Sequence, residues 1–193
     1  MSFDGTQIAY VEAAAGDAPS PKFGSIVVRS FDNATNGFGP PRVLVPFVGG
    51  AANFYPSWSP DGKWILFTRT SEMGYDQASA KTFVVPADGS RPPVELAAAN
   101  DTGELTNSWA RWVPFANTHA QTGEPIYFVT FSSKRAFGVR LAAGVRPQIW
   151  MAAFFPNRVG TAQPVSAPAF WFPFQRFAEA NHIAQWATEV PIE

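Results

Sequence analysis

The stretch Asn53–Thr70, NFYPSWSPDGKWILFTRT, decides the fold because it reads as one complete β-hairpin. The segment Ser59–Gly62 forms the turn, since proline pre-sets φ and Asp-Gly tolerates the positive φ of a tight turn. The residues that follow, Trp64–Arg69, are largely apolar on both alternating faces. This pattern predicts a strand that is buried on both sides.

The layout of this hairpin recurs along the chain. A Trp-x-Pro element begins at Trp58, Trp112 and Trp171, so its copies return at similar intervals. Near the N-terminus, Phe3–Tyr10 aligns with Pro60–Phe67 at a comparable offset. Repeats that are long enough to contain several short strands predict a toroidal or stacked β architecture.

The composition agrees with an all-β chain and excludes several classes. The 193 residues include 18 Pro and 15 Gly, which divide the chain into short segments and leave no credible long helix. There is no cysteine, so neither disulfides nor thiolate metal sites are expected. No apolar run approaches the ~20 residues of a membrane span. A net charge of −1 gives no reason to expect nucleic-acid binding.

The segment Tyr55–Phe67, YPSWSPDGKWILF, resembles the blade signature of the TolB-like β-propellers. The signature also recurs in the propeller domains of prolyl-oligopeptidase-type peptidases. It is half-present at residues 2–11, where Met1 takes the tryptophan position, and degenerate at 109–129 and 168–186. The resemblance implies four-stranded antiparallel blades, and a periplasmic or extracellular bacterial location.

We therefore expect one propeller-type domain over residues 1–193, with three to four blades. Their approximate ranges are 1–50, 51–103, 104–160 and a partial blade at 161–193. The first blade lacks an innermost strand, and the last has strands only at 169–171 and 183–186. Open sheet edges need partners. The expected ring is thus incomplete, and we expect self-association or completion by missing upstream blades; a divergent small propeller is the alternative.

Few residues suggest catalysis or metal binding. The two histidines, His119 and His182, lie in an insertion and before the last expected strand, and no Gly-x-Ser-x-Gly motif occurs. Asp32–Gly37 resembles the start of a calcium loop, but Val43 stands where the bidentate glutamate belongs. An ordinary hairpin loop is the simpler interpretation. We predict no catalytic residue, no metal and no cofactor.

The candidate binding residues lie beside the Trp-x-Pro elements and in the basic third of the chain. Residues 111–176 carry seven basic groups and one acidic group, a sum of +6. The resemblance implies that the loops entering the innermost strands rim a central channel. The candidates are Phe54, Tyr55, Asn107, Trp109, Arg111 and Arg135. The alternatives are that Phe54 and Trp109 only hold blades together, and that Arg135 forms a structural ion pair.

The sequence thus predicts a non-enzymatic scaffold that binds a protein or a cell-envelope glycan. Rigid blades would carry loops that recognise the partner. Two alternatives remain open: the propeller portion of a larger hydrolase or peptidase, and a structural subunit that self-assembles through open blade edges.

Overall fold

The computed structural model describes residues 1–13, 22–100 and 106–187. Within these ranges the chain is all-β, with one 3-10 turn, η1 (Pro156–Arg158), and no α-helix. The described residues include no helix that is long and apolar enough to cross a membrane. The expectation of an all-β chain without long helices is confirmed for this part of the chain.

The strands form three antiparallel four-stranded sheets that follow one another along the chain. The first sheet contains β1 (Gln7–Ala13), β2 (Gly24–Asp32), β3 (Gly37–Phe38) and β4 (Arg42–Val45). The second contains β5 (Ala52–Trp58), β6 (Trp64–Thr70), β7 (Lys81–Pro86) and β8 (Val94–Glu95). The third contains β9 (Ser108–Thr118), β10 (Pro125–Ser133), β11 (Gln148–Phe154) and β12 (Phe170–Trp171).

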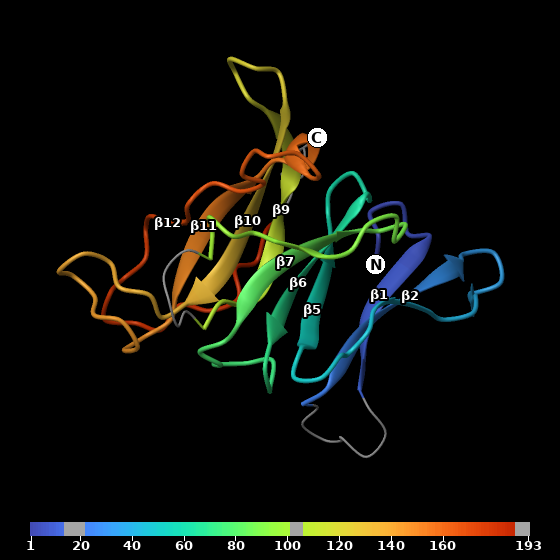
Figure 1. Ribbon diagram of the computed structural model, residues 1–193, viewed down its shortest axis with the longest axis horizontal. Coiled ribbons are helices and arrows are strands. Elements are labelled where there is room, and N and C mark those ends of the chain that lie inside the picture. Colours follow the sequence, from blue (N-terminus) through green and yellow to red (C-terminus); the bar gives the residue numbers. More distant parts are fainter. Residues whose placement is uncertain (14–21, 101–105, 188–193) are drawn as a thin grey trace, which may run out of the picture.

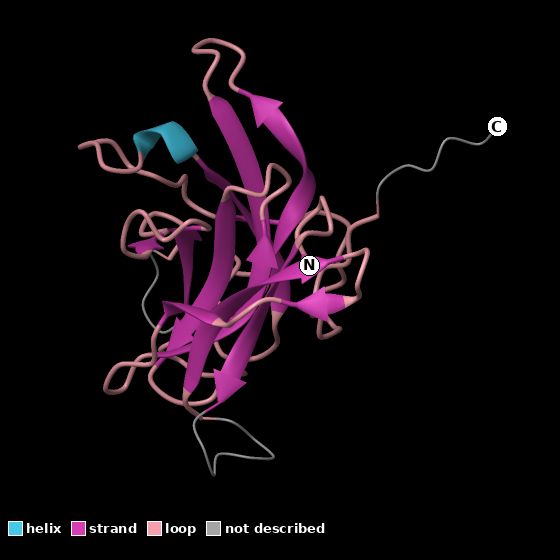
Figure 2. Cartoon of the chain, turned by 90° about the vertical axis from the view of Figure 1, so that its right-hand side faces the viewer, coloured by secondary structure: helices cyan, strands magenta, loops and turns pink. Residues whose placement is uncertain are grey.

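The three sheets lie side by side in chain order and do not close into a ring (Figure 1). The hairpin of β9 and β10 extends beyond its neighbours and projects from one end of the molecule (Figure 2). The insertion that contains His119 is this projecting tip, in which β9 continues to Thr118 before the turn.

The repeat seen in the sequence is reproduced in the hydrogen bonds of two turns. In the second sheet, Ser59 Oγ donates to Asp61 Oδ1 at 2.6 Å and accepts from Trp64 N at 2.9 Å. At the N-terminus, Ser2 Oγ donates to Asp4 Oδ1 at 2.6 Å and accepts from Gln7 N at 2.9 Å. Because these turns are identical, β1 is the counterpart of β6, so the described part of the first sheet has no counterpart of β5.

The core lies between the sheets, where alternating side chains of neighbouring sheets pack together. One cluster joins the first sheet to the second and includes Ile26, Trp58 and Phe67. The other joins the second sheet to the third and includes Leu66, Trp112 and Phe154. Because β6 contributes to both clusters, it is buried on both faces, as its sequence predicted.

The C-terminal segment differs from the expected fourth blade. Phe170 and Trp171 pair with β11 as the outer strand of the third sheet, and no strand forms at residues 183–186. This segment instead packs against the third sheet: the Trp186 indole donates to Thr130 Oγ1 at 3.1 Å, and Ile183 N donates to Ser132 Oγ. The Trp-x-Pro pattern therefore marks an inner strand at residues 58 and 112, but not at 171.

Trp58 tests the packing between the first two sheets. The side chain is 5 % exposed and lies in the cluster between them, so Trp58→Ala should lower the free energy of unfolding by about 3–5 kcal/mol. Phe174→Ala is the control, because Phe174 is 97 % exposed and its loss should cost about 0.5 kcal/mol or less. Denaturant unfolding of both variants gives the comparison, and equal losses would contradict the packing.

Candidate functional site

The innermost strands β5 and β9 each carry an aromatic residue with an unusual backbone conformation. Tyr55 has a φ of 57° and Trp109 a φ of 56°, and the two residues hold the same position in the repeat, upstream of Trp58 and Trp112. The pairing of β5 with β6 and of β9 with β10 shifts register around these residues. A positive φ costs an L-residue about 1–3 kcal/mol and tends to persist where it serves a site.

The two bulged aromatics contact each other across the boundary between the second and third sheets. The Tyr55 and Trp109 rings stack with centroids 4.1 Å apart and an interplanar angle of 21°. Tyr75, from the loop between β6 and β7, meets the edge of Trp109 at 6.4 Å and approaches His182 Nε2 at 3.4 Å. Tyr55 and Trp109 are half-buried, so the bulges place a partly accessible aromatic surface at the inner strands.

Arg111, which follows Trp109 closely, is a half-buried cation on the same strand. The only hydrogen bond of its side chain among the described residues is a long one, from Nη1 to Ala110 O at 3.4 Å, and no described carboxylate pairs with it. Burial lowers its pKa, while the nearby Tyr55 acts in the opposite direction. A partly desolvated guanidinium without an anion is a ready partner for a carboxylate.

A cavity of about 310 Å³ lies beside Arg111. Its wall combines the end of β5, the middle of β9, the N-terminal Met1 and Phe3, and residues 184–186. This size lies at the lower end of the range for small-ligand pockets, about 300–1,000 Å³. The segment around Trp186 therefore helps to form the site although it lies far from Arg111 in the sequence.

The environment of Tyr55 is apolar enough to change the pKa of its phenol. Burial raises the pKa of Tyr55 to about 12, with a further contribution from the neighbouring Tyr75 and an opposing one from Arg111. The phenol is therefore neutral throughout the physiological range. It offers a hydroxyl group and a ring face rather than a charge.

Two of the polar candidate residues, one beside a Trp-x-Pro element and one in the basic third of the chain, are buried in the structure. Asn107 is fully buried, and its amide donates to Asn100 Oδ1 at 2.9 Å. Arg135 donates to Asn107 Oδ1 and to Ala99 O, both at 3.0 Å, and lies over the Trp150 ring at 4.9 Å. Burial lowers the pKa of Arg135 to about 10. Its hydrogen bonds are to neutral groups, and among the described residues no carboxylate pairs with it, so the structural ion pair of the alternative is not seen there.

Phe54 is also buried instead of lining a rim, with 5 % of its surface exposed. Its ring lies against the backbone of Gly24 and Gly74, where an added Cβ would come within 3.3 Å and 2.7 Å of ring atoms. Of the six candidate residues, the structure brings Tyr55, Trp109 and Arg111 together at a partly exposed surface. The other three hold the sheets in place.

Sequence reasoning missed Tyr75 and the C-terminal segment with His182 and Trp186. The loop of Tyr75 shows no motif, the C-terminal segment carries only the degenerate copy of the signature at 168–186, and tertiary packing brings both to the inner strands. One signal was present: Tyr55 and Trp109 occupy equivalent repeat positions, but only the backbone dihedral angles show the bulge.

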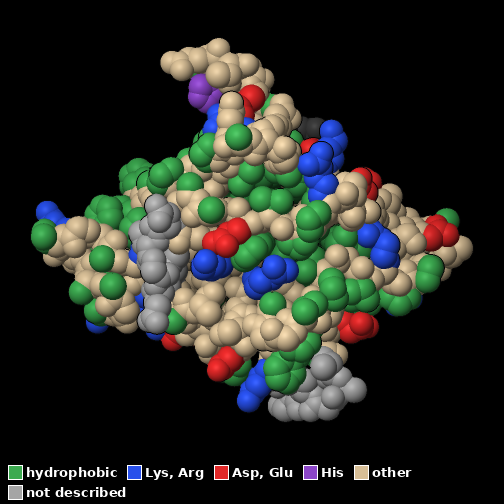
Figure 3. All heavy atoms as spheres, viewed as in Figure 1, with side chains coloured by type: hydrophobic (Ala, Val, Ile, Leu, Met, Phe, Trp, Pro, Cys, Tyr) green, Lys and Arg blue, Asp and Glu red, His purple; other side chains and the backbone are tan. Residues whose placement is uncertain are grey.

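Most of the other chemistry-bearing residues have structural partners. Asp32 accepts from Ala34 N at 2.9 Å and from the Thr35 hydroxyl at 2.8 Å, as in an ordinary hairpin turn. In the basic third, Arg158 forms a bidentate pair with Glu124, and Lys134 pairs with Asp76. Figure 3 shows basic and acidic side chains interspersed on the face in view. The described residues include no group of three or more histidine or acidic side chains that could hold a metal ion.

Comparisons with known proteins give no family for this chain. Neither a scan against protein-family models nor a search of curated proteins found a match. The case for a function therefore depends on the geometry of the residues described above.

The positive φ of Trp109 gives a test of the bulge. Trp109→Gly should be more stable to unfolding than Trp109→Ala by at least about 0.5 kcal/mol, because only glycine adopts this conformation without steric cost. Val113, on the same strand and outside the positive-φ set, is the control. There the alanine variant should be the more stable. An alanine variant at 109 that equals the glycine variant would show that no bulge forms in solution.

Proposed function

We propose that this chain is a non-enzymatic binding scaffold of the TolB-like propeller type. It recognises a protein or glycan partner that carries a carboxylate. The observation that carries this proposal is the pair of bulged aromatics, Tyr55 and Trp109, stacked beside a half-buried Arg111 that no described carboxylate neutralises. The three four-stranded antiparallel sheets support the propeller assignment at the level of architecture.

Each group in the site has a distinct part in this recognition. The Arg111 guanidinium donates to the partner's carboxylate from a partly desolvated position, which strengthens the interaction relative to one in water. The Trp109 and Tyr55 rings supply apolar contact to the remainder of the partner. Because β5 and β9 hold the groups before binding, little conformational entropy is lost when the partner arrives. A scaffold of this kind fits a periplasmic or extracellular protein.

The test is calorimetric titration with two probes, an oligogalacturonate and a short glutamate-containing peptide, with neutral dextran oligomers for comparison. A carboxylated probe should bind, and Arg111→Ala should weaken its binding at least about tenfold, since a charge-assisted hydrogen bond is lost. Raising the salt concentration should weaken it too. Comparison of the two probes separates a glycan from a protein partner.

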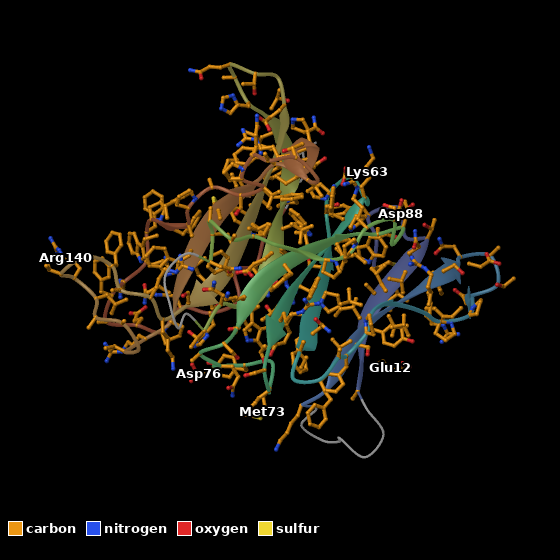
Figure 4. All side chains as sticks on the ribbon, viewed as in Figure 1. Glu12, Lys63, Met73, Asp76, Asp88 and Arg140 are labelled. Carbon is orange, nitrogen blue, oxygen red and sulfur yellow. The ribbon has the colours of Figure 1, made fainter. Side chains whose placement is uncertain are left out.

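Arg140→Ala is the matched control, because Arg140 is exposed and lies in a distant loop at the edge of the molecule (Figure 4). It removes the same charge and should leave the affinity unchanged. Binding that Arg111→Ala does not alter, or that dextran reproduces, would contradict the proposal.

A second candidate function, self-assembly, is favoured by the open edge of β1. Within the described ranges this strand pairs with β2 alone, whereas its counterpart β6 pairs with both β5 and β7. An unpaired edge in a sheet of this kind can add a strand from another molecule.

Light scattering tests self-assembly directly. We expect a mass above the 21.0 kDa of one chain, rising with concentration. Ile8→Lys should reduce it, because a charge on an edge strand opposes strand addition. Neighbouring side chains of a strand point to opposite faces, and Ala9 packs against the core cluster. The lysine introduced at position 8 therefore need not enter that core. Ile8→Val is the control, and a monomer of unchanged mass at high concentration would exclude this function.

A further inference from the structure

A larger cavity, of about 640 Å³, lies at the opposite ends of the strands from the Tyr75 loop and involves all three sheets. The first sheet contributes Arg42, at the start of β4. The second contributes the turn before β6 and the turn after β7. The loop at η1, which follows the third strand of the third sheet, closes the remaining side. This cavity shares no lining residue with the one beside Arg111.

Three cations from separate segments line the cavity: Arg42, Lys63 and Arg91. None of them forms an ion pair with a carboxylate among the residues that the structure describes. Asp88 is the one acidic residue in the lining. Figure 4 shows Lys63 and Asp88 at the same end of the molecule, far from Arg140. Three positive charges against one negative charge leave the wall with a net charge of +2.

Backbone geometry holds the two guanidinium groups in place. A Cβ on Gly89, whose φ is +76°, would lie 3.1 Å from Arg42 Nη1. A Cβ on Gly160, whose φ is +85°, would clash directly with the Arg91 guanidinium. Arg42 also donates to Ala87 O at 2.7 Å. Both guanidinium groups therefore pack against glycine backbone, although Arg42 and Arg91 are exposed side chains overall.

The nearby carboxylates are largely engaged elsewhere. Asp88 accepts from Ser90 N at 2.9 Å, and this bond is the largest cause of its lowered pKa, with Arg42 the smallest. Asp61, in the turn before Lys63, accepts from Ser59, Lys63 N and the Tyr127 hydroxyl. Neither carboxylate neutralises the three side-chain cations.

The remaining wall indicates an organic ligand and not a bare ion. Trp64 and Val159 provide apolar surface, and Gln7 and Asn157 provide amide groups that can bond to hydroxyls. We propose that this cavity binds a small sugar phosphate. A phosphate monoester carries about −1.5 to −2 charges at neutral pH, which matches the +2 wall, and guanidinium groups bind its oxygens in bidentate fashion. The sugar then occupies the space that the phosphate leaves.

The experiment is calorimetric titration of the full chain with glucose 6-phosphate, inorganic phosphate and glucose. Glucose 6-phosphate should bind, inorganic phosphate should bind at least about tenfold more weakly, and glucose should give no measurable binding. Lys63→Ala and Arg91→Ala should each weaken glucose 6-phosphate binding at least about tenfold, and Arg91→Lys should restore part of it.

Arg140→Ala and Arg111→Ala are the matched controls, and both should bind glucose 6-phosphate as the unchanged chain does. Thermal unfolding of each variant shows whether it is folded. The proposal is overturned if glucose 6-phosphate does not bind at millimolar concentration, if inorganic phosphate binds equally well, or if Arg140→Ala causes the same loss. Arg111→Ala separates this site from the carboxylate site, because the two cavities use different cations.

Discussion

A buried asparagine at the entry to each of the two innermost strands is the contact on which the arrangement of the sheets depends. Asn53 donates to Gly24 O and Pro46 O of the first sheet, and Asn107 donates to Asn100 of the second. In both cases an arginine fixes the amide: Arg69 Nε donates to Asn53 Oδ1 at 2.9 Å, and Arg135 donates to Asn107 Oδ1 at 3.0 Å. A buried amide without hydrogen-bond partners would cost free energy. Each asparagine–arginine pair, which we call a clamp, therefore favours one position of its sheet relative to the preceding sheet.

Each arginine of the clamp also packs on an aromatic ring of the third strand in its own sheet. Arg69 lies 4.6 Å from the centre of the Phe83 ring, and Arg135 lies 4.9 Å from that of Trp150. A cation over a ring retains attraction where water is excluded. The repeated unit is therefore an asparagine, an arginine and an aromatic residue, which binds an inner strand to its own sheet and to the preceding one.

The bulges follow directly from this anchoring. Asn53 and Asn107 are held at the entry of β5 and β9, while the rest of each strand remains paired with its neighbour. Between the paired positions on either side of the bulge, each inner strand has one residue more than its partner strand. The bulge that this residue creates lies at Tyr55 and at Trp109, which have positive φ and whose rings stack on each other. The same two strands therefore provide both the buried asparagines and the half-buried rings of the site.

The first and third sheets, at the two ends of the stack, differ in what packs against them. The C-terminal segment packs against the third sheet through Gln175, which bonds to Ile149 N and O, and through Trp186. On the first sheet, the described residues include no strand beyond β1. Exposed Val43 and Phe38 also lie on the strands of this sheet. The self-assembly that we propose would act at this end of the molecule, whereas the C-terminal segment at the other end contributes residues 184–186 to the wall of the cavity beside Arg111.

The sequence by itself determined the hairpin of β5 and β6, the recurrence of its layout along the chain and the burial of the strand at Trp64–Arg69 on both faces. These features are local, since Gly and Pro turns and alternating apolar residues specify a hairpin without reference to the rest of the chain. The equivalence of the turns at Ser2 and Ser59 was likewise readable from the alignment of Phe3–Tyr10 with Pro60–Phe67.

Only the tertiary structure decided which polar and aromatic candidates face solvent. Arg111 and Arg135 look alike in the sequence, yet one lies half-buried beside a cavity and the other is enclosed by Asn107 and Trp150. The sequence predicted a strand at 169–171 but not its place as the outer strand of the third sheet, because Trp171-Phe172-Pro173 carries the same Trp-x-Pro pattern as an inner strand. Such differences depend on which partners the fold supplies, and a short motif does not contain that information.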